Sequence, residues 1–123
     1  MRVAGFGFRN GASEASLADA LAQAGGSGGL DALASLAGKA DDAALKALAE
    51  RLALPVIAVD SEMLAAQQTR TQSARILAMH GTGSVAEAAA LAGCGAGARL
   101  LGPRQSSADR MATAAIAISG EPS

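Results

Sequence analysis

The residues that could do chemistry gather in the first thirteen positions of the chain. A short apolar run ends in a glycine-rich turn that carries Arg9, and Ser13 then opens an amphipathic helical pattern. A strand, a turn and a helix N-terminus in this order form an anion site, because backbone N–H groups and the positive end of the helix point at one place. Arg9 adds a full charge there. The alternative interpretation is a tight strand–helix turn with an exposed arginine.

Gly7, Asn10 and Gly11 complete this opening turn. The spacing Gly5-Phe-Gly7-Phe-Arg9-Asn-Gly11 is not the dinucleotide-binding fingerprint, because the third glycine comes one residue late. No acidic residue follows at the end of a clear second strand, where such a site would hold a ribose. The pattern therefore leaves a simple anion site and a structural turn as the two interpretations.

Lys39 and Arg104 are two further cations in positions where a ligand could bind. Lys39 lies just before the second helical pattern, at the expected exit of a strand. Ligands of open α/β sheets bind beyond the carboxyl ends of the strands. Arg104 follows Gly102 and Pro103 in a turn, where it is either a second anion ligand or a turn charge. A solvated surface lysine is the alternative for Lys39.

His80 and Glu87 are the candidates for a general base. His80 lies in a long irregular stretch, residues 68–83, where a histidine could shuttle protons, and the alternative interpretation is an exposed loop residue. Glu87 is the fourth residue of a capping box that begins at Ser84, and this structural role explains it without catalysis. The letters of a nucleophile elbow, Gly25-Gly-Ser27-Gly-Gly29, follow a helix instead of a strand and predict a linker.

The composition excludes several classes of function. A net charge of -1 and only two aromatic residues, Phe6 and Phe8, argue against binding of nucleic acid. With one cysteine, Cys94, and one histidine, we expect no disulfide within the chain, no metal site and no cofactor. No apolar run approaches the length of a membrane span or of a signal peptide. We expect a cytoplasmic protein that does not bind a membrane.

The hydrophobic pattern predicts a single α/β domain over residues 1–123, with a three-layer α/β/α architecture. The expected sheet is mixed, mostly parallel and built of about five strands, with helices on both faces. The segment 30–37 fits a helix or a strand, and the helix that follows it favours a strand. The expected strands are Arg2–Phe8, Ala32–Leu36, Pro55–Val59, Ala98–Leu101 and Met111–Ser119, the last two antiparallel. The expected helices are Ser13–Ala24, Asp42–Leu52 capped by Asp41, a short one from Asp60 or Ser61 through Gln67, and Val85–Leu91 ended by Gly93, Gly95 and Gly97.

Several of these segments together resemble one family, which comprises the CobE protein and the C-terminal domain of CbiG, both of cobalamin (vitamin B12) biosynthesis. The opening turn is similar to the family's Gly-x-Gly-Cys-Arg-Arg-Gly turn, with Phe8 in place of the cysteine and Asn10 in place of the second arginine. The segment 83–90, Gly-Ser-Val-Ala-Glu-Ala-Ala-Ala, is the most specific match. The segment 34–42 around Lys39 and the closing Pro103-Arg104 turn with its strand also match, so the resemblance covers nearly the whole chain.

The resemblance implies a role in building the corrin ring. The chain is most like the stand-alone CobE proteins, and our first hypothesis is an accessory protein that binds a precorrin or corrinoid intermediate. Arg9, Lys39 and Arg104 would hold ligand carboxylates, and the backbone amides of Gly11–Ser13 would hold another.

Two other hypotheses follow from the same resemblance. CbiG proteins open the lactone of a cobalt-precorrin and release acetaldehyde. A lactone hydrolase would use the Gly11–Ser13 amides as an oxyanion site and His80 or Glu87 as the base. The third hypothesis is an adaptor for the methyltransferases or other enzymes of cobalamin biosynthesis.

Overall fold

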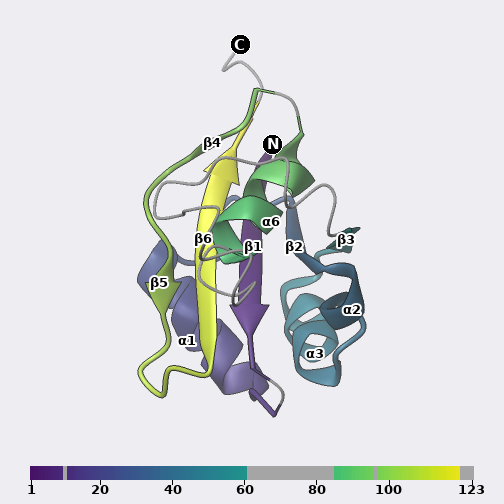
Figure 1. The fold of residues 1–123 in the computed structure, drawn as a ribbon, viewed down its shortest axis with the longest axis vertical. Coiled ribbons are helices and arrows are strands. Elements are labelled where there is room, and N and C mark those ends of the chain that lie inside the picture. The colour runs from purple at the N-terminus through teal and green to yellow at the C-terminus, as the bar shows by residue number, and fades with distance from the viewer. Residues whose placement is uncertain (10, 61–84, 96, 120–123) are drawn as a thin grey trace.

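The structure is a mixed β-sheet with helices on both of its faces (Figure 1). This computed structural model describes residues 1–9, 11–60, 85–95 and 97–119. The described strands are β1 (Arg2–Phe8), β2 (Ala32–Leu36), β3 (Val56–Val59), β4 (Arg99–Leu100), β5 (Gln105–Ser106) and β6 (Ala112–Ile118). The described helices are α1 (Glu14–Ala24), α2 (Ala37–Ala40), α3 (Ala43–Leu52) and α6 (Val85–Cys94).

The sheet order is β3-β2-β1-β6-β4, with β5 also paired to β6, so that β1 lies in the middle. Strands β1, β2 and β3 are parallel to one another, and their carboxyl ends share one edge of the sheet. Strand β6 runs antiparallel to β1, to β4 and to β5. The expected three layers, mixed sheet and antiparallel last strands are confirmed. Among the described strands, however, three pairings are antiparallel and two are parallel, because β6 pairs in this way with all of its neighbours.

Strand β1 is buried on both faces, and its two faces differ. Ala4, Phe6 and Phe8 pack with α1 and α3 in one core cluster. Val3 packs with the alanines of α6 in the other cluster. Side chains alternate along a strand, so Gly5 and Gly7 lie on the α6 side with Val3. The large side chains of β1 thus pack against α1 and α3. The glycines on its other face leave room for α6.

Gly5 allows α6 to lie directly on the backbone of β1. A Cβ atom at Gly5 would collide with the Ala86 carbonyl oxygen and the Ala90 amide nitrogen. A Cβ atom at Gly7 would lie 3.3 Å from the Cβ of Val85 and 3.1 Å from the Thr113 hydroxyl. The glycines of the opening motif, Gly5 and Gly7, therefore allow the first turn of α6 to pack closely against the carboxyl-terminal half of β1.

The structure corrects several details of the expected elements. Asp42, not Asp41, caps the second long helix, because its Oδ1 accepts the Ala44 N–H at 2.9 Å. Asp41 instead forms an exposed ion pair with Lys46. Gly93 lies inside α6, where its lack of a side chain fits the close contact with Ala34. The short helix α2 and the two-residue strand β5 were not expected, since neither is long enough to show a periodic pattern.

Several expectations fall on residues outside those that the structure describes. These are the helix through Gln67, the irregular stretch 68–83 with His80, the capping role of Ser84, and Asn10. In the described part of the chain, no helix is both long and apolar enough to cross a membrane.

Candidate anion-binding site

Arg9 follows the last residue of β1 at the carboxyl edge of the sheet. Its backbone N–H donates to the Met111 carbonyl at 2.9 Å, which extends the pairing with the segment leading into β6. Its side chain is exposed and forms no ion pair with another residue that the structure describes. Arg9 is therefore a fixed backbone position that carries an accessible guanidinium group.

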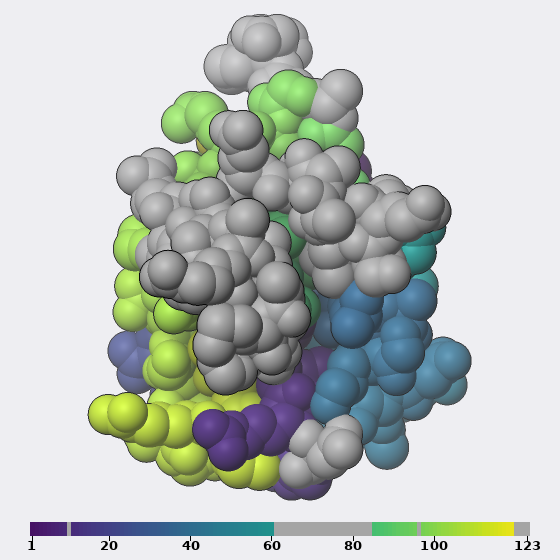
Figure 2. Space-filling model, in the orientation of Figure 1, coloured from purple at the N-terminus to yellow at the C-terminus, as the bar shows by residue number. Residues whose placement is uncertain are grey.

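Lys39 comes to the same edge from the neighbouring strand. It belongs to α2, which follows β2 directly. Its Nζ lies 5.0 Å from the centroid of the Phe8 ring, within the range of a cation–π interaction. Phe8 immediately precedes Arg9, so the ends of β1 and β2 each contribute one cation. Figure 2 shows the purple N-terminal segment reaching the surface at the lower edge, between the blue segment and the yellow-green one that leads into β6.

The backbone amides of Gly11–Ser13 are partly engaged within the turn. The Ala12 N–H donates to the Arg9 carbonyl at 3.1 Å. Gly11 has a φ of 88°, which closes the turn in a conformation that glycine adopts without strain. The Ser13 hydroxyl caps α1 by accepting the Ser16 N–H at 3.1 Å, as the sequence predicts. An oxyanion or carboxylate at this turn would have to do without the Ala12 amide.

A carboxylate of the chain itself lies near the N-terminus of α1. The hydroxyl of Ser16, which is buried in the first turn, donates to Asp109 Oδ2. The Ser107 hydroxyl and the Met111 N–H both donate to Asp109 Oδ1, at 2.6 and 3.0 Å. These hydrogen bonds, from Ser107 first and then Ser16, lower the pKa of Asp109 to about 2. Because Asp109 already provides a negative charge there, Arg9 and Lys39 are better placed than this helix end to bind a ligand.

Arg104 lies apart from the two cations at the strand ends. Gln105 pairs with Ala114, which in turn pairs with Phe6. Arg104 precedes Gln105, so it lies level with Gly5, which is in the middle of β1. Strand β6 separates it from β1. Its backbone N–H donates to Glu87 Oε2 at 2.8 Å, in the first turn of α6. The structure thus brings Arg9 and Lys39 to the same strand ends and does not place Arg104 with them.

The structure also locates the remaining sequence candidates. Gly7 is covered by α6 and Thr113, whose hydroxyl donates to the Gly7 carbonyl at 3.2 Å. The linker 25–29 joins α1 to β2 at the opposite edge of the sheet, away from the strand ends that carry Arg9 and Lys39. Among the described residues, no group of three His, Cys, Asp or Glu side chains could hold a metal ion.

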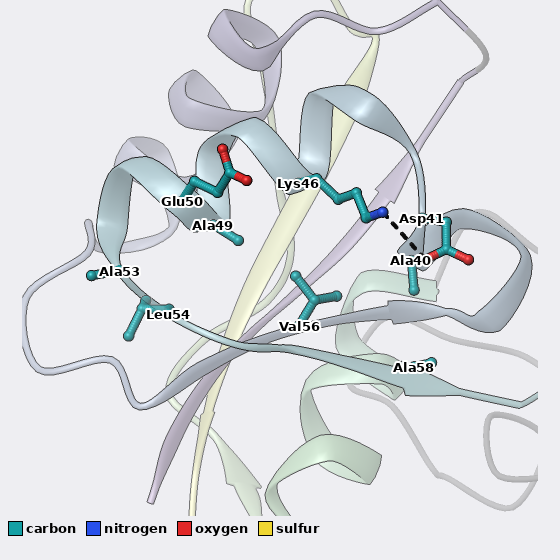
Figure 3. Close-up of a pocket in the computed structure, with 9 residues that line it drawn as sticks. All are labelled: Ala40, Asp41, Lys46, Ala49, Glu50, Ala53, Leu54, Val56 and Ala58. Atoms are coloured by element: carbon teal, nitrogen blue, oxygen red, sulfur yellow. Dashed lines mark ion pairs between the residues drawn. The ribbon is translucent and has the colours of Figure 1, made fainter.

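A groove of about 660 Å³ lies at the β3 edge of the sheet, where no sequence motif predicts it. Its apolar lining includes Ala49 of α3, Val56 of β3 and Leu54 in the connection between them, as Figure 3 shows. The charged residues that line it are Asp41, Lys46 and Glu50, with Lys46 paired to Asp41 at 3.9 Å. Two carboxylates against one ammonium group make this groove unsuitable for an anion, whereas Arg9 and Lys39 suit one.

The fold and the site together define an α/β domain that presents cations at the carboxyl ends of its central strands. Comparison with known families gives a match to the family described as Cobalamin synthesis G C-terminus, over residues 2–117. The chain belongs to this family of cobalamin (vitamin B12) biosynthesis proteins. The resemblance stated from the sequence motifs is thereby confirmed.

Two solved structures are similar over almost their full length. One is CobE, described as a protein from the cobalamin (vitamin B12) biosynthetic pathway. It is 38% identical with a TM-score of 0.77, over 95% of this chain and 92% of that one. The other is the cobalamin biosynthesis protein chiG from Agrobacterium tumefaciens str. C58. It is 34% identical with a TM-score of 0.72, over 98% of this chain and 100% of that one. A comparison with curated proteins finds no match.

Proposed function

We propose that this protein binds a precorrin or corrinoid intermediate of cobalamin biosynthesis through the ligand's carboxylates. The observation that carries the proposal is the convergence of Arg9 and Lys39 at the ends of β1 and β2, with Lys39 lying over the Phe8 ring next to Arg9. Corrin-ring intermediates carry several acetate and propionate side chains. Charge-assisted hydrogen bonds from arginine and lysine are the strongest that a protein offers to carboxylates.

The spread of the cations also supports a large ligand. Arg104 lies two strands away from β1, on the side of the sheet that α6 covers. A small monocarboxylate would engage one of these cations at a time. A macrocycle with carboxylates around its rim offers several of them at once, and contacts of moderate strength with more than one of Arg9, Lys39 and Arg104 would add to its affinity.

An absorbance titration tests this proposal. The purified protein is titrated with hydrogenobyrinic acid and with precorrins made in situ, whose chromophores report a change of environment. We expect saturable binding with a shifted spectrum, weakened by added salt because exposed charge pairs are screened. No spectral change and no retention of any corrinoid on gel filtration would contradict the proposal. In that case a stable complex with a biosynthetic methyltransferase would favour the adaptor hypothesis.

Product analysis on the same samples tests the lactone hydrolase hypothesis. The described contacts give it less support, because Glu87 is fully buried and already accepts the Arg104 N–H, and because the Ala12 amide donates within its own turn. A hydrolase would release a two-carbon fragment, and Glu87→Ala or His80→Ala would abolish that release while the fold is retained. Stoichiometric binding without product would support the accessory role.

A further inference from the structure

Glu87 carries a carboxylate in the protein interior, where a charged group is energetically unfavourable. Its side chain has 0% exposure and lies in the first turn of α6. Burial of an ionisable group is unfavourable unless hydrogen bonds or an opposite charge compensate for it. An apolar side chain of similar size would fill the same space at lower cost. Packing alone therefore does not explain why a glutamate stands at this position.

One contact of Glu87 joins helix α6 to the outer segment of the sheet. Its Oε2 accepts the backbone N–H of Arg104 at 2.8 Å. Arg104 lies where the outer strand is interrupted: Leu101 still donates its N–H to the Ile116 carbonyl, and pairing with β6 resumes at Gln105. The Arg104 amide thus bonds to helix α6 instead of to strand β6. This bond ties the segment between β4 and β5 to the helix.

The helix that carries Glu87 packs directly on the central strand of the sheet. Gly5 lets the backbone of α6 lie on β1 at Ala86, the residue before Glu87. The chain of contacts therefore runs from the central strand to α6, from Glu87 to the Arg104 amide, and from there to the Arg104 guanidinium group. A binding side chain held through a rigid element loses less conformational entropy when its ligand arrives.

We infer that Glu87 is a positioning residue, which fixes Arg104 so that its guanidinium group can bind a carboxylate of the corrinoid ligand. This assignment rests on the proposed function. It gives the buried carboxylate a role in ligand affinity rather than in proton transfer. It also predicts that the effect of Glu87 on ligand affinity requires the Arg104 side chain.

A double-mutant cycle with hydrogenobyrinic acid as the probe tests this inference. We expect Arg104→Ala to raise the Kd about ten- to a hundredfold, the usual effect of losing a charged hydrogen bond. Glu87→Leu should raise the Kd by a comparable factor in the wild-type background, but by no more than about twofold when Arg104 is already alanine. Glu87→Gln keeps an acceptor oxygen and should lose less affinity than Glu87→Leu. Matched controls are Glu50→Leu in α3 and Arg99→Ala in β4.

Amide hydrogen exchange adds a readout that needs no folded Glu87→Leu variant. The Arg104 amide of the wild type should exchange slowly, because its acceptor is fully buried, and more rapidly in Glu87→Gln. An unprotected Arg104 amide, or a loss of affinity on Glu87→Leu that is equal in both backgrounds, would overturn the role of Glu87 while the proposed function stands. Failure of the wild-type protein to bind hydrogenobyrinic acid would overturn the proposed function, and the role of Glu87 would fall with it.

Discussion

At the scale of single residues, Arg9 tests the anion-binding proposal most directly. Its guanidinium group is exposed, so Arg9→Ala should weaken binding of hydrogenobyrinic acid by about 1.5–3 kcal/mol. The free energy of unfolding should change by less than about 0.5 kcal/mol, as is usual for an exposed side chain. Calorimetric titration and urea denaturation measure the two quantities. Arg99→Ala is the control. Arg99 pairs with Ile118, which pairs with Arg2, so Arg99 lies level with the amino end of β1, at the opposite end of that strand from Arg9. Equal affinity of Arg9→Ala and wild type would contradict the site.

Asp109 makes stability depend on pH in the acid range. Hydrogen bonds from Ser107 and Ser16 lower its pKa from 3.8 to about 2 in the folded protein. Because the folded state favours the ionised form, the stabilisation is fully present above pH 3.8 and is lost as the pH falls towards 2. The urea midpoint of the wild type should fall over this window. Asp109→Asn should show a flatter profile, and a profile as steep as the wild type's would contradict the assignment.

The cations of the site could be predicted from the sequence, but their arrangement could not. Arg9 and Lys39 stand out because charge follows directly on apolar strand patterns at two strand exits. The sequence predicts Glu87 as part of a capping box, a local pattern of four residues, and as a candidate general base, but it does not indicate the partner of this side chain. Its bond to Arg104, and that of Ser16 to Asp109, join segments far apart in the chain. No periodicity or motif reports such contacts.

At the scale of elements, the seat of α6 on β1 is the contact most sensitive to substitution. Gly5→Ala should destabilise the protein by about 2 kcal/mol or more, because its Cβ would meet backbone atoms of Ala86 and Ala90 that cannot move separately. Gly38→Ala is the control, since a Cβ there meets no atom within 4 Å, and it should be neutral or slightly stabilising. Thermal denaturation of the two variants gives the comparison. Similar stability of both would show that α6 does not lie this close to β1.

Most elements could be predicted because each carries a strong local signal. The bounds of β1 are as expected, since its apolar run is continuous, and Ser13 marks the start of α1. The choice of a strand for Ala32–Leu36 came from the alternation of strands and helices and is confirmed. The glycines of the opening motif pointed to a ligand turn, yet in the structure they make room for a helix. Only the three-dimensional contact distinguishes these two uses of glycine.

At the scale of the whole molecule, Cys94 reports on how tightly the sheet and α6 remain packed. Burial raises the pKa of its thiol, and the Sγ–H donates to the Ala117 carbonyl at 3.2 Å. The native protein should therefore react slowly with a disulfide reagent at pH 8, at a rate set by opening of the structure. Urea below the unfolding midpoint should accelerate the labelling in proportion to the unfolded fraction. Rapid labelling of the native protein would mean that α6 separates from the sheet without global unfolding.

The central place of β1 also determines when the fold can form during synthesis. Its neighbours are β2, made soon after it, and β6, the last described strand to leave the ribosome. Until residues 112–118 emerge, one edge of β1 has no partner and the apolar faces around it stay incomplete. Pairing between strands so distant in the chain makes folding slow compared with a helical bundle of the same length. A stalled or truncated product that lacks β6 would expose the open edge of β1, the usual template for aggregation.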